Sequence, residues 1–170
     1  YIFESIKSYL IKNEKITDNW NSLNTISEHA STVGSYDLGI YKTNDGSNEL
    51  LTNLENHKYE IVYLLGEDSL QFKKQNEFII YQGSHGDRGA EIADIILPGS
   101  AYTEQDGYFT NLEGKLQKAF KASYPPGESK EDWKIINELS EIINNKKLFN
   151  NKVDLENNML NYLNLFKEKN

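Results

Sequence analysis

Apolar residues recur at helical spacing at both ends of the chain. The first set predicts an amphipathic helix over about residues 2–11, and the last set predicts one over about residues 153–169. The positions that define these helices are Ile2, Phe3, Ile6, Tyr9 and Leu10, and then Leu155, Met159, Tyr162, Leu163 and Phe166. Because an amphipathic helix must bury its apolar face, we expect the terminal helices, about 1–12 and 153–169, to pack on partner chains.

The same spacing predicts two internal helices. One begins near Thr17 or Asp18, either of which is a suitable N-cap, and ends at Gly34. The other follows the break at Pro125-Pro126-Gly127 and is capped by Ser129–Asp132. Their apolar positions are Trp20, Leu23, Ile26, Ala30 and Val33 in the first helix, and Trp133, Ile135, Ile136, Leu139, Ile142 and Ile143 in the second.

Short apolar runs in the middle of the chain are typical of β-strands. Tyr59–Leu65 is β-branched and apolar, which predicts a central strand of a parallel sheet. Glu77–Gln82 predicts the next strand, and residues 94–97 predict a third, which must end at Pro98 because proline cannot continue the ladder. A glycine-rich loop and a short helix over residues 90–93 join the second of these strands to the third.

These elements together predict an α/β fold. We expect a single domain over residues 1–170, with an open, mostly parallel sheet flanked by helices and an amphipathic helix at each end. Residues 101–118 lack a long apolar run, which favours an extended segment over the edge of the sheet.

Composition narrows the possible partners. A net charge of -8 disfavours nucleic acid and anionic membrane surfaces as partners. The chain has no cysteine, so its own residues cannot ligate an iron–sulfur cluster or a thiolate zinc site. No apolar run reaches the roughly 20 residues that span a bilayer. The chain begins at Tyr1 rather than methionine, so we expect a processed chain or a piece of a longer polypeptide.

The loop Gly83–Gly89 is the strongest candidate for chemistry. Its glycines could bring backbone N–H groups close to a phosphate, but their spacing matches neither Gly-x-Gly-x-x-Gly nor a Walker loop, so a tight structural loop is favoured. His85, Asp87 and Arg88 are residue types suited to acid–base work or anion binding, and a role in fixing the loop or an interface is the alternative that we favour. The sequence predicts neither a catalytic triad nor a metal site.

Several motifs in order resemble one known family. They are Tyr81-Gln82-Gly83-Ser84-His85-Gly86-Asp87-Arg88-Gly89-Ala90, Ile92-Ala93-Asp94-Ile95-Ile96-Leu97-Pro98-Gly99, Ala101-Tyr102-Thr103-Glu104, Asn111-Leu112-Glu113-Gly114 and Glu131-Asp132-Trp133-Lys134-Ile135-Ile136. In this order they resemble the largest iron–sulfur subunit of respiratory complex I, the seventy-five-kilodalton or G-type subunit of NADH:ubiquinone oxidoreductase. The resemblance covers most of the chain.

The resemblance implies a place in the carboxyl-terminal, molybdopterin-oxidoreductase-like part of that subunit. The cysteine-bearing amino-terminal part of the family is missing here, so a split subunit or a separate piece is implied, with the iron–sulfur clusters on a partner chain. In the wider family these segments border the pterin dinucleotide, whereas complex I relatives look like a version without it. A vestigial pterin edge that binds no cofactor is therefore implied at Gly83, His85, Gly86, Gly89, Ala93, Asp94, Leu97, Pro98, Asn111, Glu113 and Gly114.

The functional expectation is a structural, non-catalytic part of the complex I peripheral arm, on the matrix side of the mitochondrial inner membrane. Its partners would be other peripheral-arm subunits, above all the cysteine-rich half of the same subunit. The alternative is a cofactor-binding fragment of a molybdopterin-dependent, formate dehydrogenase-like oxidoreductase. A weaker third possibility is an independent small-ligand module.

Overall fold

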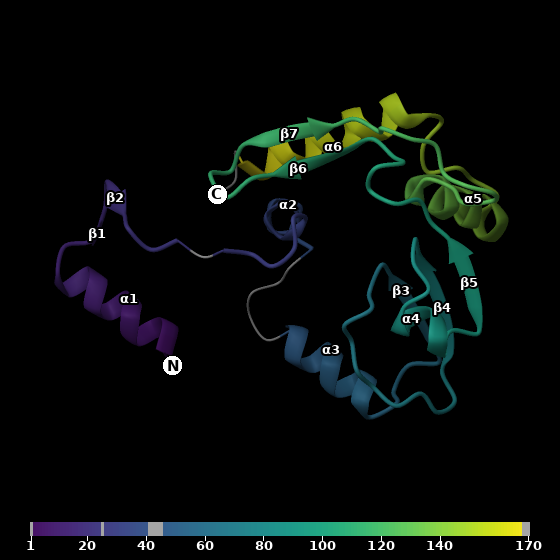
Figure 1. Cartoon of the computed structure of the whole chain (residues 1–170), viewed down its shortest axis with the longest axis horizontal. Helices are drawn as coiled ribbons and strands as arrows, with labels where there is room; N and C mark the ends of the chain where they lie inside the picture. The colour runs from purple at the N-terminus through teal and green to yellow at the C-terminus, as the bar shows by residue number, and fades with distance from the viewer. Residues whose placement is uncertain (1, 25, 41–45, 168–170) are drawn as a thin grey trace.

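The computed structural model describes residues 2–24, 26–40 and 46–167. In chain order its helices and strands are α1 (Ile2–Lys12), β1 (Ile16–Thr17), β2 (Trp20–Asn21), α2 (Thr32–Asp37), α3 (Gly46–Glu55), β3 (Ile61–Leu65), β4 (Phe78–Gly83), α4 (Arg88–Ile92), β5 (Ile95–Pro98), β6 (Gly107–Thr110), β7 (Leu116–Ala119), α5 (Asp132–Asn144) and α6 (Lys152–Lys167). Figure 1 shows a small parallel sheet at one side of the molecule, with α3, α4 and α5 near it and β6, β7, α2 and α6 in a neighbouring group.

The predicted parallel sheet is confirmed, with strand order β3-β4-β5. Ile61 pairs with Phe78 and Ile80 pairs with Ile95, so both pairs of strands run parallel. α4 forms the connection between β4 and β5, which gives the predicted strand–loop–helix–strand unit. The prediction that Tyr59–Leu65 is a central strand is wrong, because β4 lies between β3 and β5. An apolar run reports burial of a strand but not its place in the sheet.

One face of the sheet carries the main core. The buried residues that form it are Leu54, Leu64, Phe72, Ile79 and Tyr81, with Val62, Leu70, Ala90, Ile92 and Ala93 packed around them. Leu54 comes from α3, and Leu70 and Phe72 come from the irregular connection between β3 and β4. This connection therefore covers the sheet, a role that a crossover helix has in most parallel folds.

Residues 101–118, predicted as an extended segment, instead contain most of an antiparallel hairpin. β6 and β7 pair from Gly107 opposite Ala119 to Thr110 opposite Leu116. The turn is fixed by Asn111, whose Oδ1 accepts hydrogen bonds from the backbone N–H groups of Glu113 (3.0 Å) and Lys115 (2.9 Å). Gly114 occupies the left-handed region at φ 78°. Asn and Gly at these positions were a turn signal, but each strand is too short for its alternation to be seen in the sequence.

The predicted helix from Thr17 to Gly34 is also wrong. Lys15 N–H bonds back to the Leu10 carbonyl (2.8 Å), and the chain then forms the short hairpin β1–β2. Trp20 and Ile26, two apolar positions of that helix, are exposed. Helical spacing without a packing surface does not stabilise a helix. The helix that forms is α2, which contains Gly34 in its interior.

The two helices predicted near the end of the chain are confirmed as α5 and α6, although positions 168–169 lie outside the described residues. Buried Asn137 joins α5 to the connection that follows it. Its Oδ1 accepts from Leu148 N–H (2.8 Å) and Phe149 N–H (3.0 Å), and its Nδ2 donates to the Phe149 carbonyl (3.0 Å). These bonds fix the reversal of the chain, which passes through a left-handed residue at Asn145.

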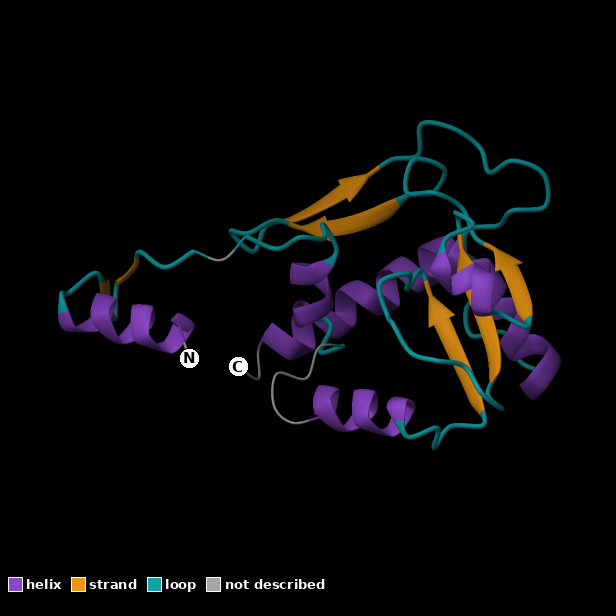
Figure 2. Cartoon of the chain, turned by 60° about the horizontal axis from the view of Figure 1, so that its bottom comes forward, coloured by secondary structure: helices purple, strands orange, loops and turns teal. Residues whose placement is uncertain are grey.

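The predicted first helix is confirmed as α1, and it stands apart from the rest of the chain together with β1 and β2 (Figures 1 and 2). Ile2, Phe3, Ile6 and Tyr9 are exposed on it. Packing of this helix on a partner chain stays a prediction. None of the helices in the described part of the chain is both long and apolar enough to cross a membrane.

Candidate functional site

The carboxyl ends of β4 and β5 border a hollow of about 350 Å³. Such an edge is where open α/β sheets usually bind ligands. The residues that line it are Gly83, Ser84, His85, Pro98, Gly99, Ala101, Glu104, Pro126, Glu128 and Ser129. The loop after β4 and the segments around Pro98 and Pro126 therefore form the candidate site.

The ring of Tyr81 occupies the space next to two glycines of the loop. A side-chain carbon at Gly83 would lie 2.8 Å from Tyr81 Cε1, and one at Gly89 would lie 2.5 Å from Tyr81 Cδ2 and 2.8 Å from the Glu67 carbonyl oxygen. Gly86 has open space around it. Gly83 and Gly89 are thus needed for the packing of a tyrosine ring from the preceding strand.

The hydroxyl of Tyr81 fixes the same loop. It donates to Asp68 Oδ2 (2.9 Å) and lies 3.1 Å from the His85 carbonyl oxygen, while Asp68 Oδ1 accepts from Gly89 N–H (3.0 Å). Burial, the hydrogen bond to Asp68 and the charges of Asp68 and Asp87 raise the pKa of Tyr81 to about 12. The phenol is therefore neutral at physiological pH and serves as a structural donor.

The hollow has an acidic lining. Glu104 and Glu128 contribute carboxylates, and the described residues that line it include neither lysine nor arginine. His85 Nδ1 is paired with Ser84 Oγ at 2.9 Å. A phosphate group would meet repulsion from the carboxylates and would find no lysine or arginine partner among these residues. The residues present do not fit a phosphate-bearing pterin cofactor.

The residues predicted as a vestigial edge fall into separate places. Gly83, His85 and Pro98 line the hollow, whereas Asp94 lies at the opposite end of the sheet. There its Oδ2 accepts from Ile79 N–H (2.7 Å), and its Oδ1 pairs with Lys74 Nζ (2.6 Å). These interactions lower the pKa of Asp94.

The other predicted edge residues, Asn111, Glu113 and Gly114, form the β6–β7 turn, which points away from the sheet in Figure 1. Asn111 borders a second hollow of about 310 Å³, where apolar contacts come from Ala30, Val33, Phe109 and Leu112. The predicted set therefore does not form one site.

A polar network beneath the edge was missing from the sequence prediction. Buried Gln82 accepts a hydrogen bond from the Tyr63 hydroxyl and donates to Asp132 Oδ1 (2.8 Å). Asp132 Oδ2 accepts from Gln105 Nε2 (2.9 Å). A side-chain carbon at Gly99 would lie 2.7 Å from Asp132 Oδ1, so this glycine admits the carboxylate. Gln82, a polar residue between apolar strand positions, was the only sequence signal.

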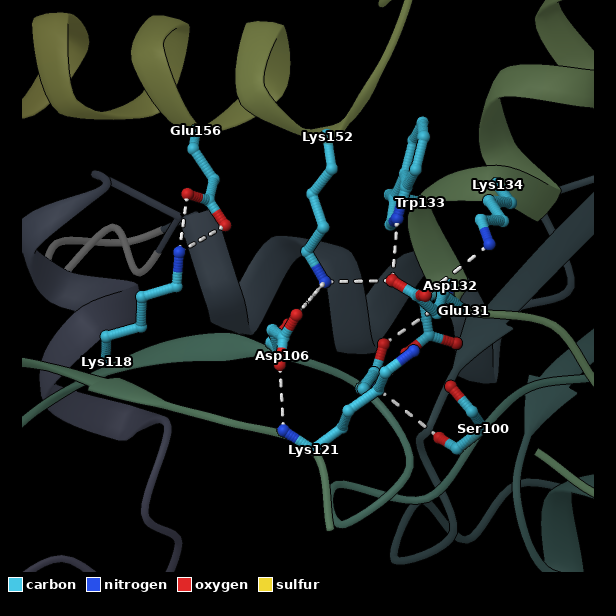
Figure 3. Close-up of polar contacts among 11 residues, drawn as sticks. Ser100, Asp106, Lys118, Lys121, Glu131, Asp132, Trp133, Lys134, Lys152 and Glu156 are labelled. Carbon is cyan, nitrogen blue, oxygen red and sulfur yellow. Dashed lines mark hydrogen bonds and ion pairs between the residues drawn. The ribbon is translucent and has the colours of Figure 1, made fainter. Parts of the chain in front are cut away.

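Glu131 is the centre of a second network, shown in Figure 3. Its Oε2 accepts from Lys152 Nζ (2.8 Å) and Trp133 Nε1 (3.0 Å), and Lys152 Nζ also donates to the Asp106 carbonyl (3.0 Å). Burial alone would raise the pKa of Glu131, but the hydrogen bonds from Lys152 and Trp133 and the nearby ammonium charges lower it to about 2. The network joins the starts of α5 and α6 to the segment before β6.

α6 is held to the hairpin at a further point. Lys118 Nζ of β7 pairs with Glu156 Oε2 at 2.8 Å, and Tyr108 of β6 donates to the same oxygen (3.2 Å). The hydrogen bond that Lys118 donates to the Glu156 carboxylate raises the pKa of Lys118. Figure 3 shows this pair beside the Lys152 contacts, both on the side of α6 that faces the hairpin. α6 thus packs on its own chain along this side.

The shifted ionisable groups have structural partners. Tyr81 and Glu131, the residues with the largest shifts, are each bonded to neighbouring elements. Across residues 2–24, 26–40 and 46–167, no three histidine, aspartate or glutamate side chains gather in a way that could hold a metal ion. The arrangement favours holding elements together over acid–base chemistry.

Comparison with known proteins identifies close relatives. A family model described as molybdopterin oxidoreductase matches residues 1–142. The chain is 47% identical over 146 residues to the NADH-ubiquinone oxidoreductase 75 kDa subunit of Reclinomonas americana, covering 85% of this chain and 21% of that protein. It is 41% identical over 148 residues to the mitochondrial NADH-ubiquinone oxidoreductase 78 kDa subunit of Candida albicans, covering 85% and 19%.

A bacterial relative gives the same result. The chain is 45% identical over 143 residues to the G-type subunit of the NADH-quinone oxidoreductase of Rickettsia bellii, covering 84% of this chain and 20% of that protein. The chain thus spans about a fifth of the length of these relatives. The resemblance inferred from the order of the motifs is confirmed.

Proposed function

Because this chain belongs to the molybdopterin oxidoreductase family, and its relatives carry the names of complex I subunits, we propose that it is a structural, non-catalytic part of the complex I peripheral arm. The observation that carries this proposal is the 47% identity over 146 residues with a 75 kDa subunit. In this role the chain scaffolds the subunits that transfer electrons from NADH to the quinone.

The proposal includes partners and a location. The iron–sulfur clusters lie on a partner chain, since cysteine ligands are absent here. The principal partner is the cysteine-rich amino-terminal half of the same subunit, and the assembly lies on the matrix side of the mitochondrial inner membrane. Support for the mitochondrial location comes from the printed name of the Candida albicans relative.

The geometry of the sheet edge favours this role over a pterin-dependent oxidoreductase. Tyr81 fills the space beside Gly83 and Gly89, and Glu104 and Glu128 would repel the phosphates of a pterin dinucleotide. The loop is already fixed by bonds within the chain, from Tyr81 to Asp68. We infer that the edge binds no cofactor.

Native electrophoresis tests the proposal. The tagged chain, solubilised from its native cells in mild detergent, should migrate with a large assembly that stains for NADH oxidation and contains a cysteine-bearing partner. Migration of the chain away from any such assembly would exclude the complex I role and favour an independent module. Stoichiometric molybdenum or tungsten that follows the chain through purification would instead support the pterin-dependent alternative.

A further inference from the structure

One face of the parallel sheet exposes apolar side chains. Residues in register on parallel strands share a face, so alternate positions of β3, β4 and β5 lie on this side. We call the exposed residues on this side the open face. They are Ile61 (63%), Tyr63 (38%), Leu65 (53%), Phe78 (43%) and Ile95 (45%). Parallel sheets are normally covered by helices on both faces, so a covering layer is missing here.

The described residues cover the opposite face better than the open face, although Ile96 of β5 is exposed on the opposite face (54%). α3, α4 and the β3–β4 connection pack on the side that bears Leu64 and Tyr81. On the open side, α5 is bonded to the sheet at the carboxyl end of β4, where Gln82 Nε2 donates to Asp132 Oδ1 (2.8 Å). The side chains of β3 and of the amino ends of β4 and β5 therefore stay uncovered on this side.

The open face continues onto the outer edge of β3, which pairs with no other strand among the described residues. Phe78 N–H donates to the Glu60 carbonyl (2.8 Å), and Gly66 N–H donates to the Gln82 carbonyl (2.7 Å). The backbone groups of even-numbered residues in and beside β3 therefore face β4. The odd-numbered residues of β3, which are Ile61, Tyr63 and Leu65, direct their backbone groups to the other side. β3 contains neither lysine nor proline, the usual protection of a free edge.

The β5 edge differs, because the chain itself extends the ladder there. Lys130 N–H bonds to the Pro98 carbonyl (3.1 Å), and Ser100 N–H bonds to the Lys130 carbonyl (2.9 Å). Ser129 Oγ adds a bond to the Gly99 carbonyl (2.6 Å). A further strand is thus expected beside β3 rather than at the carboxyl end of β5.

A second copy of this chain fits the surface poorly. A two-fold pairing of β3 edges would leave both open faces uncovered, and a face-to-face dimer would leave both edges unpaired. Two chains of net charge -8 would also repel each other. A β-strand with its adjoining helix would pair with the β3 edge and cover the open face at once. The relatives have about four-fifths of their length outside the region matched by this chain, which could supply such a unit.

We propose that the open face and the β3 edge bind one β-strand and an adjoining amphipathic α-helix from the remainder of the complex I subunit. The strand pairs along β3, and the apolar stripe of the helix covers the open face. This interface rests on the proposed function, and it identifies the surface by which the chain joins its cysteine-bearing partner.

Thiol labelling tests the interface, because the chain has no cysteine of its own. Ile61→Cys and Leu65→Cys are introduced separately, with Ile142→Cys, 78% exposed on α5, as the matched control. In the free chain all three should react with a maleimide at similar rates. In the NADH-oxidising assembly the first two should react at least about tenfold more slowly, and the control should react as before.

Equal labelling of Ile61→Cys and Leu65→Cys in the free and assembled chain would overturn the proposed interface. A disulfide between two copies of Ile61→Cys in the assembly would also overturn it, in favour of a second copy. Absence of the unmodified chain from the assembly would instead refute the proposed function itself. The failures of the two proposals are therefore distinguishable.

A charge placed on the open face provides an independent measurement. Ile61→Lys should reduce the assembled fraction by about tenfold or more, because the ammonium would be buried without a partner. Ile142→Lys, the matched control, should assemble like the unmodified chain. Both variants should show unchanged thermal unfolding as free chains, since both positions are exposed. Normal assembly of Ile61→Lys would contradict the proposal.

Discussion

Replacement of Glu131 by glutamine should weaken the attachment of α6 to the rest of the chain. The Glu131 carboxylate is buried and accepts hydrogen bonds from Lys152 and Trp133. Glu131→Gln keeps the size of the side chain and one acceptor oxygen, but it removes the charge. The Lys152 ammonium then stays partly buried with a weaker partner, Asp106 Oδ2 at 3.6 Å.

The magnitude follows from the pKa of Glu131. Its fall from 4.5 to about 2 means that the folded chain favours the ionised form, which corresponds to about 3 kcal/mol of stability at neutral pH. This stabilisation is fully present above pH 4.5, the unfolded value, and is lost as the pH falls through 4.5 toward 2. Glu131→Gln should therefore lower the free energy of unfolding by about 3 kcal/mol at pH 7.

Urea unfolding followed by tryptophan fluorescence measures this effect. The chain has two tryptophans, so a Trp20→Phe background leaves Trp133, a member of the network, as the reporter. The difference in free energy of unfolding between the parent and Glu131→Gln should shrink as the pH is lowered from 5 toward 2. Glu128→Gln, a change at an exposed carboxylate, is the matched control and should cost less than about 0.5 kcal/mol.

Either of two results would refute this account of Glu131. One is a loss at pH 7 no larger than that of the Glu128→Gln control. The other is a gap between parent and variant that stays constant from pH 5 to pH 2. A constant gap would mean that the side chain contributes through packing and neutral hydrogen bonds, without a contribution from its charge.

Three further changes have definite expected outcomes. Gly89→Ala should lower the free energy of unfolding by about 1–3 kcal/mol, measured by urea unfolding, because the new side chain would clash with Tyr81. Its control is Gly86→Ala, in open space, which should change this free energy by less than about 0.5 kcal/mol. Tyr81→Phe should remove the phenol that titrates near pH 12 in ultraviolet difference spectra. In the parent, the stability that comes from this raised pKa should be lost as the pH rises from about 10 to 12, and Tyr81→Phe should lack this loss. Asn137→Ala should lower the free energy of unfolding by about 2 kcal/mol, measured by urea unfolding, because the backbone N–H groups of Leu148 and Phe149 lose their shared acceptor. Asn144→Ala, at an exposed position, should be nearly neutral.

The sequence predicted the elements whose local pattern and packing agree. β4 and β5 have apolar runs that end at Gly83 and at Pro98, and the two strands pair with each other within one short segment joined by α4. α5 has both a break before it and an apolar stripe with a partner, including buried Ile135. Where an element has clear local signals and packs on a neighbour close in sequence, the sequence alone is sufficient to predict that element.

The sequence failed where the outcome depends on distant partners. The pattern from Thr17 to Val33 has helical spacing, but the described residues leave Trp20 and Ile26 exposed, so part of its apolar stripe has no surface to pack on. β6 and β7 were missed because four-residue strands have too little alternation to be recognised. The bond between Gln82 and Asp132 joins residues 50 positions apart, so no local pattern could predict it.

The glycine-rich loop shows that one sequence motif is compatible with two kinds of contact. Glycines after a parallel strand are compatible with two different occupants, a phosphate that approaches the backbone or a side chain that packs against it. Here Tyr81 is that side chain, and its hydroxyl uses Asp68 as an acceptor, so the chain itself fills the space beside Gly83 and Gly89. The lining of the hollow adds the carboxylates of Glu104 and Glu128, which would repel a phosphate. The contacts of Tyr81 therefore support the proposal that this edge has a structural role.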